Sequence, residues 1–302
     1  MTPPRLPLGA VRRARTMDEF ALLSEISTTQ ASIDHSTQLE PRPDDVIIST
    51  YPKCGTTWMQ QIVHGLRSGA SMAFGEISEV VPFMEVAHDC GIDLNAPQAF
   101  APRAFKTHYG ADELPAGAKY IVVLRDPMDA CISFYNFMVG WYLEPGTVSV
   151  ETYTEESFLK AKGSWRYWTH LASWWPKRNE DTVLMFCFED IKNDPAAAIS
   201  QVARFMGLAP DAALERLVLE QSSIEFMRAH KHQFDDNLLR RARDEVMGLP
   251  ADGESSKVKT GKVGASKALL PERLRVRFED AWREEALPVT GAASYEELRA
   301  MV

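Results

Sequence analysis

Three short segments hold most of the side chains in this sequence that could do chemistry together. The first, YPKCGTTW at residues 51–58, places a lysine, a glycine and two threonines in one turn. The second, KTH at 106–108, places a histidine two residues after a lysine, and the third, RDPMDACISFY at 125–135, joins an arginine to a serine. Cationic, hydroxyl and imidazole groups suit an anionic ligand and a proton transfer.

The first segment has the features of an anion-binding turn. It follows a buried apolar run at 45–51, which predicts a strand, and precedes a helical pattern from Thr56 to Arg67. Backbone N–H groups and the positive end of a helix meet at such a turn, and Gly55 lets the backbone approach a ligand closely. Thr56 and Thr57 add hydroxyls and Lys53 adds a full charge. From these residues alone, a plain strand-to-helix turn with a surface lysine is the alternative.

The third segment follows the clearest strand pattern in the chain, KYIVVL at 119–124. Arg125 would stand at the end of that strand, where parallel sheets bind ligands, and can grip a phosphate with two hydrogen bonds. Pro127 suits a helix start, and the predicted helix runs to Met138 with Ser133 two turns inside it. A salt-bridged Arg–Asp pair with a packing serine is the alternative.

His108 is the candidate general base. It ends a short predicted strand at 103–107, and a neutral imidazole can take a proton at pH 7 because its ordinary pKa is near 6.5. The chain has seven histidines, and most of them should be surface or hydrogen-bonded structural residues.

The remaining patterns predict an α/β fold with a mainly parallel sheet flanked by helices. A further strand is expected at 182–188, and helices are expected at 164–177, 195–205 and 271–285, with a mobile loop at 250–264. We expect a partly flexible N-terminal arm and lead-in helix at 1–40, within which 1–15 is a flexible basic arm, and a single domain at 41–302.

Composition narrows the class of protein. The formal charge is −9, from 33 Lys and Arg against 42 Asp and Glu, which argues against a nucleic-acid partner. No apolar run approaches the roughly 20 residues of a membrane helix, and the basic start lacks the apolar core of a secretory signal. Four separated cysteines indicate free thiols in a reducing cytoplasm and suggest no metal site. Cys54 is expected to be the reactive one, because an anion-binding turn can lower a thiol pKa.

The three segments together resemble the cytosolic-type sulfotransferase family, which uses the donor 3′-phosphoadenosine 5′-phosphosulfate (PAPS). Residues 52–58 are similar to the family's 5′-phosphosulfate loop, residues 106–108 to its K-T-H strand, and residues 125–135 to its 3′-phosphate motif. The resemblance covers about residues 44–282 and implies a P-loop-like sulfotransferase fold. The nucleotide-triphosphate pattern GxxxxGK[ST] is absent, which counts against a kinase.

The resemblance also implies roles for residues. His108 takes the acceptor proton, and Lys53 and Lys106 stabilise charge around the sulfuryl group during an in-line displacement. Ser133 is implied to hold Lys53 away from the bridging oxygen until the acceptor binds. The implied donor-binding residues are Lys53, Cys54, Gly55, Thr56, Thr57, Trp58, Arg125, Ser133, Phe188, Ser222, Ile224, Lys259, Thr260 and Gly261. Trp58 is expected to stack on adenine, and no metal is required.

The later motifs depart from the family pattern. Phe188 stands where the family has the tyrosine of YED, and Ser222 and Ile224 stand in a variant of T-S-F-E-x-M. The R-K-G loop over the 3′-phosphate is reduced to Lys259-Thr260-Gly261 and the following D-W pair is missing, so the fixed guanidinium fork is lost. The family's dimer motif is not visible in the closing helix, and we predict no such dimer.

We therefore predict a sulfotransferase that acts on a hydroxyl or amine of a small, aromatic or lipophilic acceptor. The residues expected to line the acceptor pocket, together with the segment at 230–234, are Phe74, Phe83, Met84, Phe137, Trp141 and Tyr142. These side chains could equally be ordinary core. A non-catalytic nucleotide-binding protein of the same fold and, less favoured, a P-loop small-molecule kinase are the alternatives.

Overall fold

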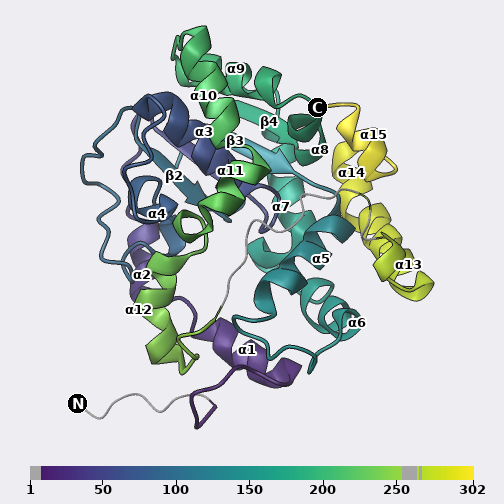
Figure 1. The fold of residues 1–302 in the computed structure, drawn as a ribbon. Helices are drawn as coiled ribbons and strands as arrows, with labels where there is room; N and C mark the ends of the chain where they lie inside the picture. Colours follow the sequence, from purple (N-terminus) through teal and green to yellow (C-terminus); the bar gives the residue numbers. More distant parts are fainter. Residues whose placement is uncertain (1–7, 254–263, 265–266) are drawn as a thin grey trace.

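A four-stranded parallel sheet forms the centre of the computed structural model, which describes residues 8–253, 264 and 267–302 (Figure 1). Within these residues the strands are β1 (Val46–Thr50), β2 (Ala104–Thr107), β3 (Lys119–Leu124) and β4 (Val183–Cys187), in the order β2-β1-β3-β4. Val46 of β1 is level with Ala104 of β2 and with Lys119 of β3. The predicted α/β class, parallel sheet and strand positions are therefore confirmed.

The sheet separates two apolar cores, as expected for a parallel sheet that is covered on both faces. Alternate residues such as Ile47, Phe105 and Val122 belong to the core shared with α5 (Pro127–Met138) and α7 (Tyr167–Trp174). Their neighbours belong to the core shared with α3 (Thr56–Ser68), α9 (Pro195–Met206) and α10 (Ala212–Gln221). The period of two along each strand places successive side chains in opposite cores.

The remaining helices complete the two layers and the segments at the sheet ends. They are α1 (Met17–Glu25), α2 (Gln30–Ser36), α4 (Ile77–Val80), α6 (Val150–Tyr153), α8 (Phe188–Asn193), α11 (Ile224–Ala229), α12 (Asn237–Met247), α13 (Glu272–Ala281), α14 (Leu287–Thr290) and α15 (Tyr295–Arg299).

Local signals explain the helices that were predicted well. Asp126 begins α5 by accepting hydrogen bonds from the amides of Met128 and Asp129, and Pro127 occupies the first turn. Gly207, with φ at 75°, ends α9 in the left-handed conformation that glycine favours.

Three predicted segments are corrected. The expected helix at 164–177 is broken, because Arg166 is extended and separates a 3₁₀ turn at Gly163–Trp165 from α7, and a second 3₁₀ turn containing Pro176 follows. The expected helix at 271–285 changes after Ala281 into a π-helical turn, Trp282–Ala286. Residues 12–15 were expected in a flexible arm, but the Ala14 amide donates to Tyr142 O and Ala14 is fully buried.

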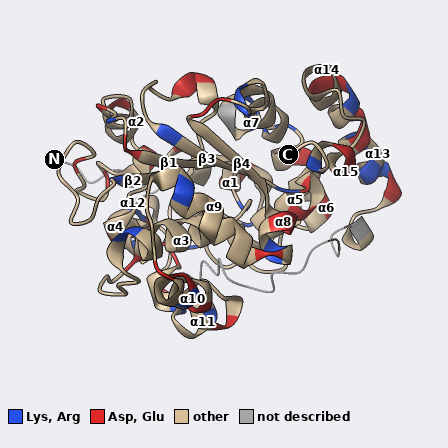
Figure 2. Cartoon of the chain, turned by 90° about the horizontal axis from the view of Figure 1, so that it is seen from above, with Lys and Arg blue, Asp and Glu red and all other residues tan. Residues whose placement is uncertain are grey.

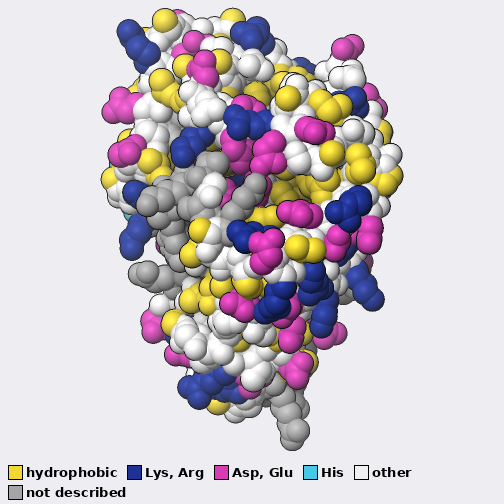
Figure 3. Space-filling view, turned by 90° about the vertical axis from the view of Figure 1, so that its right-hand side faces the viewer, with side chains coloured by type: hydrophobic (Ala, Val, Ile, Leu, Met, Phe, Trp, Pro, Cys, Tyr) yellow, Lys and Arg dark blue, Asp and Glu magenta, His cyan; other side chains and the backbone are white. Residues whose placement is uncertain are grey.

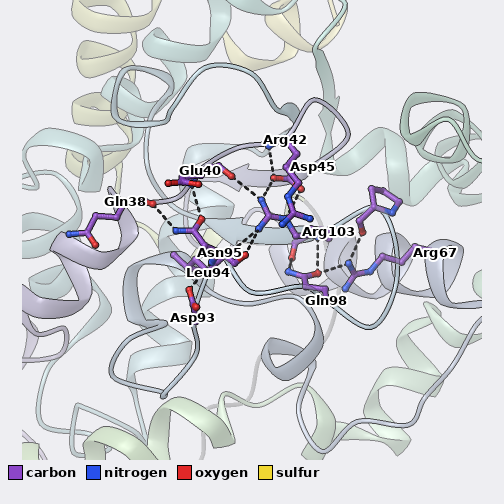
Figure 4. A network of polar contacts seen from close by, with 12 residues as sticks. Gln38, Glu40, Arg42, Asp45, Arg67, Asp93, Leu94, Asn95, Gln98 and Arg103 are labelled. Atoms are coloured by element: carbon purple, nitrogen blue, oxygen red, sulfur yellow. Dashed lines mark hydrogen bonds and ion pairs between the residues drawn. The ribbon is translucent and has the colours of Figure 1, made fainter.

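A buried polar network fixes the amino-terminal ends of β1 and β2 (Figure 4). Arg103, directly before β2, donates to both carboxylate oxygens of Asp45, directly before β1, and to the carbonyls of Glu40, Leu94 and Asn95. Because both charges are buried, the network supplies a partner for each where water cannot reach.

The residues with charged side chains of both signs belong mainly to the helices and loops around the sheet (Figure 2). The face that carries α13 shows them interspersed (Figure 3), and Arg273 there forms ion pairs with Glu151 and Glu155. None of the helices that the structure describes is both long enough and apolar enough to cross a membrane.

Candidate active site

The three candidate segments lie at the carboxyl ends of β1, β2 and β3, which are neighbours in the sheet. Residues 51–58 follow β1, His108 follows β2 directly, and Arg125 follows β3 directly. The topology therefore brings together residues that are far apart in the chain, at the edge where parallel sheets bind ligands.

The turn between β1 and α3 has an unusual backbone. Lys53 and Gly55 both have positive φ, 69° and 98°. The left-handed conformation at Lys53 is rare for a residue with a side chain and costs on the order of 1 kcal/mol. A Cβ atom added to Gly55 would lie 2.9 Å from the ring of Phe188, so this position also requires glycine.

The start of α3 suits an anion. Gly55 precedes the helix and provides no side-chain cap, so the first-turn N–H groups receive no hydrogen bond acceptor from it. The hydroxyls of Thr50 and Thr56 lie 2.5 Å apart and tie the strand end to the helix start. Together these features suit an anion, and phosphate binding at this turn stays a prediction.

Arg125 connects the second anion segment to the first. Its Nη1 donates to the carbonyl of Lys53 at 2.9 Å, and its guanidinium lies 4.5 Å from the Phe188 ring centroid. Trp58 makes an edge-on contact with the same ring, with the two ring centroids 5.5 Å apart. Asp126, the neighbour of Arg125 in the chain, accepts hydrogen bonds from the amides of Met128 and Asp129 and so caps α5.

Two buried donors in this region fit a nucleotide ligand. Arg125 Nε and Trp58 Nε1 are buried and have no hydrogen-bond partner among the residues that the structure describes. Buried donors are normally satisfied, so an orphaned pair beside an anion-binding turn is consistent with acceptors supplied by a ligand. A phosphorylated adenosine carries such acceptors on its phosphates and its base.

His108 has a defined tautomer. Its Nδ1 lies 2.7 Å from the carbonyl oxygen of Thr50, and a carbonyl can only accept, so Nδ1 carries a proton. In the neutral ring the lone pair is then on Nε2. The ring is flanked by Phe83 at 5.1 Å and Trp165 at 6.3 Å. This arrangement suits a base that takes a proton at Nε2.

Both predicted catalytic lysines lie against aromatic rings. Lys53 Nζ is 4.0 Å from the centroid of Phe137, and Lys106 Nζ is 4.2 Å from the centroid of Phe83. Lys106 is nearly buried and forms an ion pair with Asp236, with Nζ 3.8 Å from Oδ1. Cation–π contacts of this kind hold an ammonium group in place without removing its charge.

Two carboxylate residues of this region were missed from the sequence. Glu85 accepts a hydrogen bond from the His108 amide at 2.6 Å, and burial raises its pKa to about 7. A lone glutamate inside the apolar run at 81–87 was a signal for a buried acid. Asp236 carried no comparable signal, because its contact with Lys106 joins segments 130 residues apart.

The other predicted donor-binding residues are placed as follows. Thr57 and Ser133 are half-buried on α3 and α5. Ser222 is buried and donates to Leu219 O, and Ile224 begins α11. Lys259, Thr260 and Gly261 lie outside the described residues.

The expected reactivity of Cys54 was wrong. Its thiol is fully buried, and burial raises the pKa of the thiol well above its ordinary value. The side chain points into the core rather than toward the turn's N–H groups, which is why the expected lowering does not occur.

The predicted acceptor residues divide into two groups. Phe83 and Phe137 contact the two lysines. Trp141 and Tyr142 are core residues, with Trp141 Nε1 donating to Asp244, and Met84 is fully buried. Phe74 belongs to a separate small cluster with Phe234. Trp165 is 51% exposed beside His108, whereas Trp174 and Trp175 are buried.

Comparisons with known proteins place the chain in a family. The model of the sulfotransferase domain matches residues 43–289. Human sulfotransferase 1C2 is 28% identical over 270 residues, covering 84% of this chain and 88% of its own. Rat sulfotransferase 1 family member D1 is 33% identical over 221 residues, covering 68% of this chain and 73% of its own.

Solved structures show the same fold. Retinol dehydratase in complex with androsterone and the inactive cofactor PAP has a TM-score of 0.69 at 17% identity, covering 91% of this chain and 95% of its own. Mouse sulfotransferase SULT7A1 complexed with PAP has a TM-score of 0.65 at 18% identity, covering 86% and 90%. The chain therefore belongs to the sulfotransferase family, whose members transfer a sulfuryl group from PAPS to small acceptors.

Proposed function

We propose that sulfuryl transfer in this protein uses His108 as the general base, with Lys53 and Lys106 stabilising the charge that develops around sulfur. The observation that carries the proposal is the hydrogen bond from His108 Nδ1 to Thr50 O, which leaves the basic lone pair on Nε2. The Thr50 carbonyl belongs to the strand that leads into the anion-binding turn, so one strand end orients both the base and the donor site.

The reaction follows from these positions. Nε2 of His108 takes the proton of the acceptor hydroxyl or amine while that atom forms a bond to sulfur. The bond between sulfur and the bridging oxygen of PAPS breaks, and its electron pair stays on the departing phosphate. The ammonium groups of Lys53 and Lys106 offset that charge in a site whose dielectric is low. Arg125, with its buried Nε donor, would hold the 3′-phosphate, and Ser133 would steer Lys53.

The acceptor is an aromatic or lipophilic molecule that carries a hydroxyl or an amine. Phe83 and the exposed Trp165 flank the His108 ring, and Phe137 lies under the Lys53 ammonium. Flat apolar surfaces beside one base and two cations favour a flat apolar acceptor. The four free cysteines support a reducing cytoplasm as the location, and the excess of acidic residues supports a small-molecule acceptor rather than a nucleic acid.

Replacing His108 by alanine tests the assignment. We expect H108A to lower turnover by about 10²–10⁴-fold, the usual effect of removing a general base. Binding of adenosine 3′,5′-bisphosphate, measured by calorimetry, should stay within about twofold, because the nucleotide contacts lie on the β1 and β3 segments. The assay would use labelled PAPS with a panel of phenols and alcohols.

The matched control is H88A, since His88 is an exposed histidine whose ring contacts His35. H88A should retain full turnover. If H108A also retains it, His108 is not the base, and if the wild-type chain binds the nucleotide but transfers nothing to any acceptor, the proposed acceptor class is wrong.

A further inference from the structure

The ion pair between Lys106 and Asp236 lies inside the reaction centre. The side chain of Lys106 is 4% exposed and that of Asp236 is 8% exposed, so both charges are almost fully removed from water. A buried ammonium without a counter-charge is strongly disfavoured and tends to lose its proton. A carboxylate beside a buried ammonium favours its charged form, and stabilising developing negative charge requires that form.

The carboxylate of Asp236 is held by its backbone. Asp236 has a positive φ of 58° at the start of α12, a conformation that Asp and Asn tolerate better than most residues. Two residues before it, Phe234 is fully buried, and Gln233 donates to the carbonyls of Met72 and Phe74. The segment is thus packed in place, and it presents the carboxylate to Lys106 from outside the sheet.

Two carboxylates interact electrostatically with the Lys106 ammonium, and they have different roles. Glu85 comes from the 3₁₀ turn Met84–Val86, and burial raises its pKa to about 7. Its Oε1 is engaged by the His108 amide, so it serves the backbone of the base. Asp236 is the carboxylate in ion-pair contact with Nζ, and the Phe83 ring on another side limits where the ammonium can move.

We propose that Asp236 is a positioning residue for catalysis, which holds the Lys106 ammonium charged and aimed at the sulfuryl group and so couples the α11–α12 connection to the chemical step. This inference rests on the proposed role of Lys106. An ammonium has three donors, so one can face Asp236 while the others face the transferred group. Asp236 thereby acts in the transition state, and not in the binding of the nucleotide.

A double-mutant cycle tests the inference. We expect D236N to lower the single-turnover rate constant by about 10-fold or more. A loss of this size lies within the range of interaction energies between residues in contact. In a K106M background, D236N should cause no further loss, because Lys106 is the group through which Asp236 acts. The Kd of adenosine 3′,5′-bisphosphate should stay within about twofold in all variants. Asparagine is chosen because it keeps the shape and tolerates the left-handed backbone.

Further variants separate positioning from folding. D236E should restore part of the kcat that D236N loses. If D236N folds poorly, D236G replaces it in the test, because glycine accepts the left-handed backbone without strain, and D236G should then lower kcat in the same way. D252N is the matched control, since Asp252 is 78% exposed and pairs with Arg13, and it should leave kcat unchanged.

The inference is overturned if D236N leaves kcat unchanged while K106M lowers it, or if the two losses are additive. A fall in nucleotide affinity and melting temperature that accompanies an equal loss in both backgrounds would assign Asp236 a structural role instead. If K106M itself retains the wild-type rate, the proposed role of Lys106 is wrong and the inference fails with it.

Discussion

Glu85 is a buried acid that contacts the backbone of the proposed base, His108. Its Oε1 accepts the amide N–H of His108, while its Oε2 has no hydrogen-bond partner among the described residues. Burial raises its pKa to about 7, although backbone hydrogen bonds, the Thr107 side chain and the charge of Lys106 act to lower it. Near neutral pH the group is therefore partly protonated, and the protonated form keeps the Oε1 acceptor without adding a buried charge.

The E85Q variant should change how stability depends on pH. In the unfolded chain Glu85 ionises near its ordinary value of 4.5, and in the folded chain near 7. The folded state then binds more protons between these values, so this group lowers the free energy of unfolding as pH rises through that interval. Glutamine cannot ionise, so E85Q should gain stability relative to the wild type from pH 5 to pH 7, by up to about 3 kcal/mol.

Urea denaturation at pH 5, 6 and 7 would measure this difference. E284Q, at an exposed glutamate, should follow the wild-type curve at each pH. Parallel pH profiles for E85Q and the wild type would show that Glu85 is ionised in the folded chain at pH 5.

At the scale of elements, the turn between β1 and α3 depends on Gly55. A Cβ atom there would lie 2.9 Å from the Phe188 ring, which itself contacts Trp58 and the Arg125 guanidinium. We expect G55A to lose about 1–3 kcal/mol of stability through backbone strain. We also expect it to bind adenosine 3′,5′-bisphosphate at least 10-fold more weakly, since any shift of Phe188 moves both flanking residues. Calorimetry and thermal melting would measure the two effects.

G207A provides a matched control for the strain alone. Gly207 has a φ of 75° at the end of α9, and a Cβ atom there would meet nothing within 4 Å. G207A should lose stability while nucleotide affinity stays unchanged. Equal affinities for G55A and G207A would mean that the turn does not carry the nucleotide site.

The elements that the sequence predicted best are those with local signals. β3 and α5 have the predicted bounds, because an unbroken apolar run defines the strand and Asp126-Pro127 defines the helix start. The helix expected at 164–177 was wrong because the extended backbone of Arg166 breaks it, and no local sequence signal marks that break. Arg166 instead pairs with Glu285, 119 residues away.

In the candidate site too, residues with a local sequence signal were predicted and residues placed by tertiary contacts were missed. The residues on the three strand ends were predicted because each stands in a short motif. Glu85 and Asp236 reach the site through tertiary contacts with His108 and Lys106, and these contacts depend on how two loops pack. Cys54 was misjudged for a related reason, since the direction of its side chain is set by the core and not by its neighbours in the chain.

At the scale of the whole molecule, two clusters of polar groups lie at opposite ends of the sheet. The carboxyl ends of β1, β2 and β3 hold the candidate site, while the amino ends of β1 and β2 hold the Arg103 network (Figure 4). The network also includes Arg67 of α3, which donates to Gln98 and to Pro102 O. A parallel sheet makes this separation natural, because all its strands end at the same edge.

This separation predicts that stability and ligand binding can be changed independently. In D45N, the Arg103 guanidinium keeps its charge but loses the carboxylate that it contacts through Nε and Nη2, and both side chains are at most 5% exposed. Removing one partner of a buried pair costs about 3–5 kcal/mol.

D280N removes an exposed pair with Arg283 and should cost less than about 1 kcal/mol. Urea denaturation would compare the two, and adenosine 3′,5′-bisphosphate affinity, measured well below the melting temperature, should be unchanged in both. Weakened binding in D45N would show that the two ends of the sheet are coupled, because Asp45 precedes β1 and the anion-binding turn follows β1.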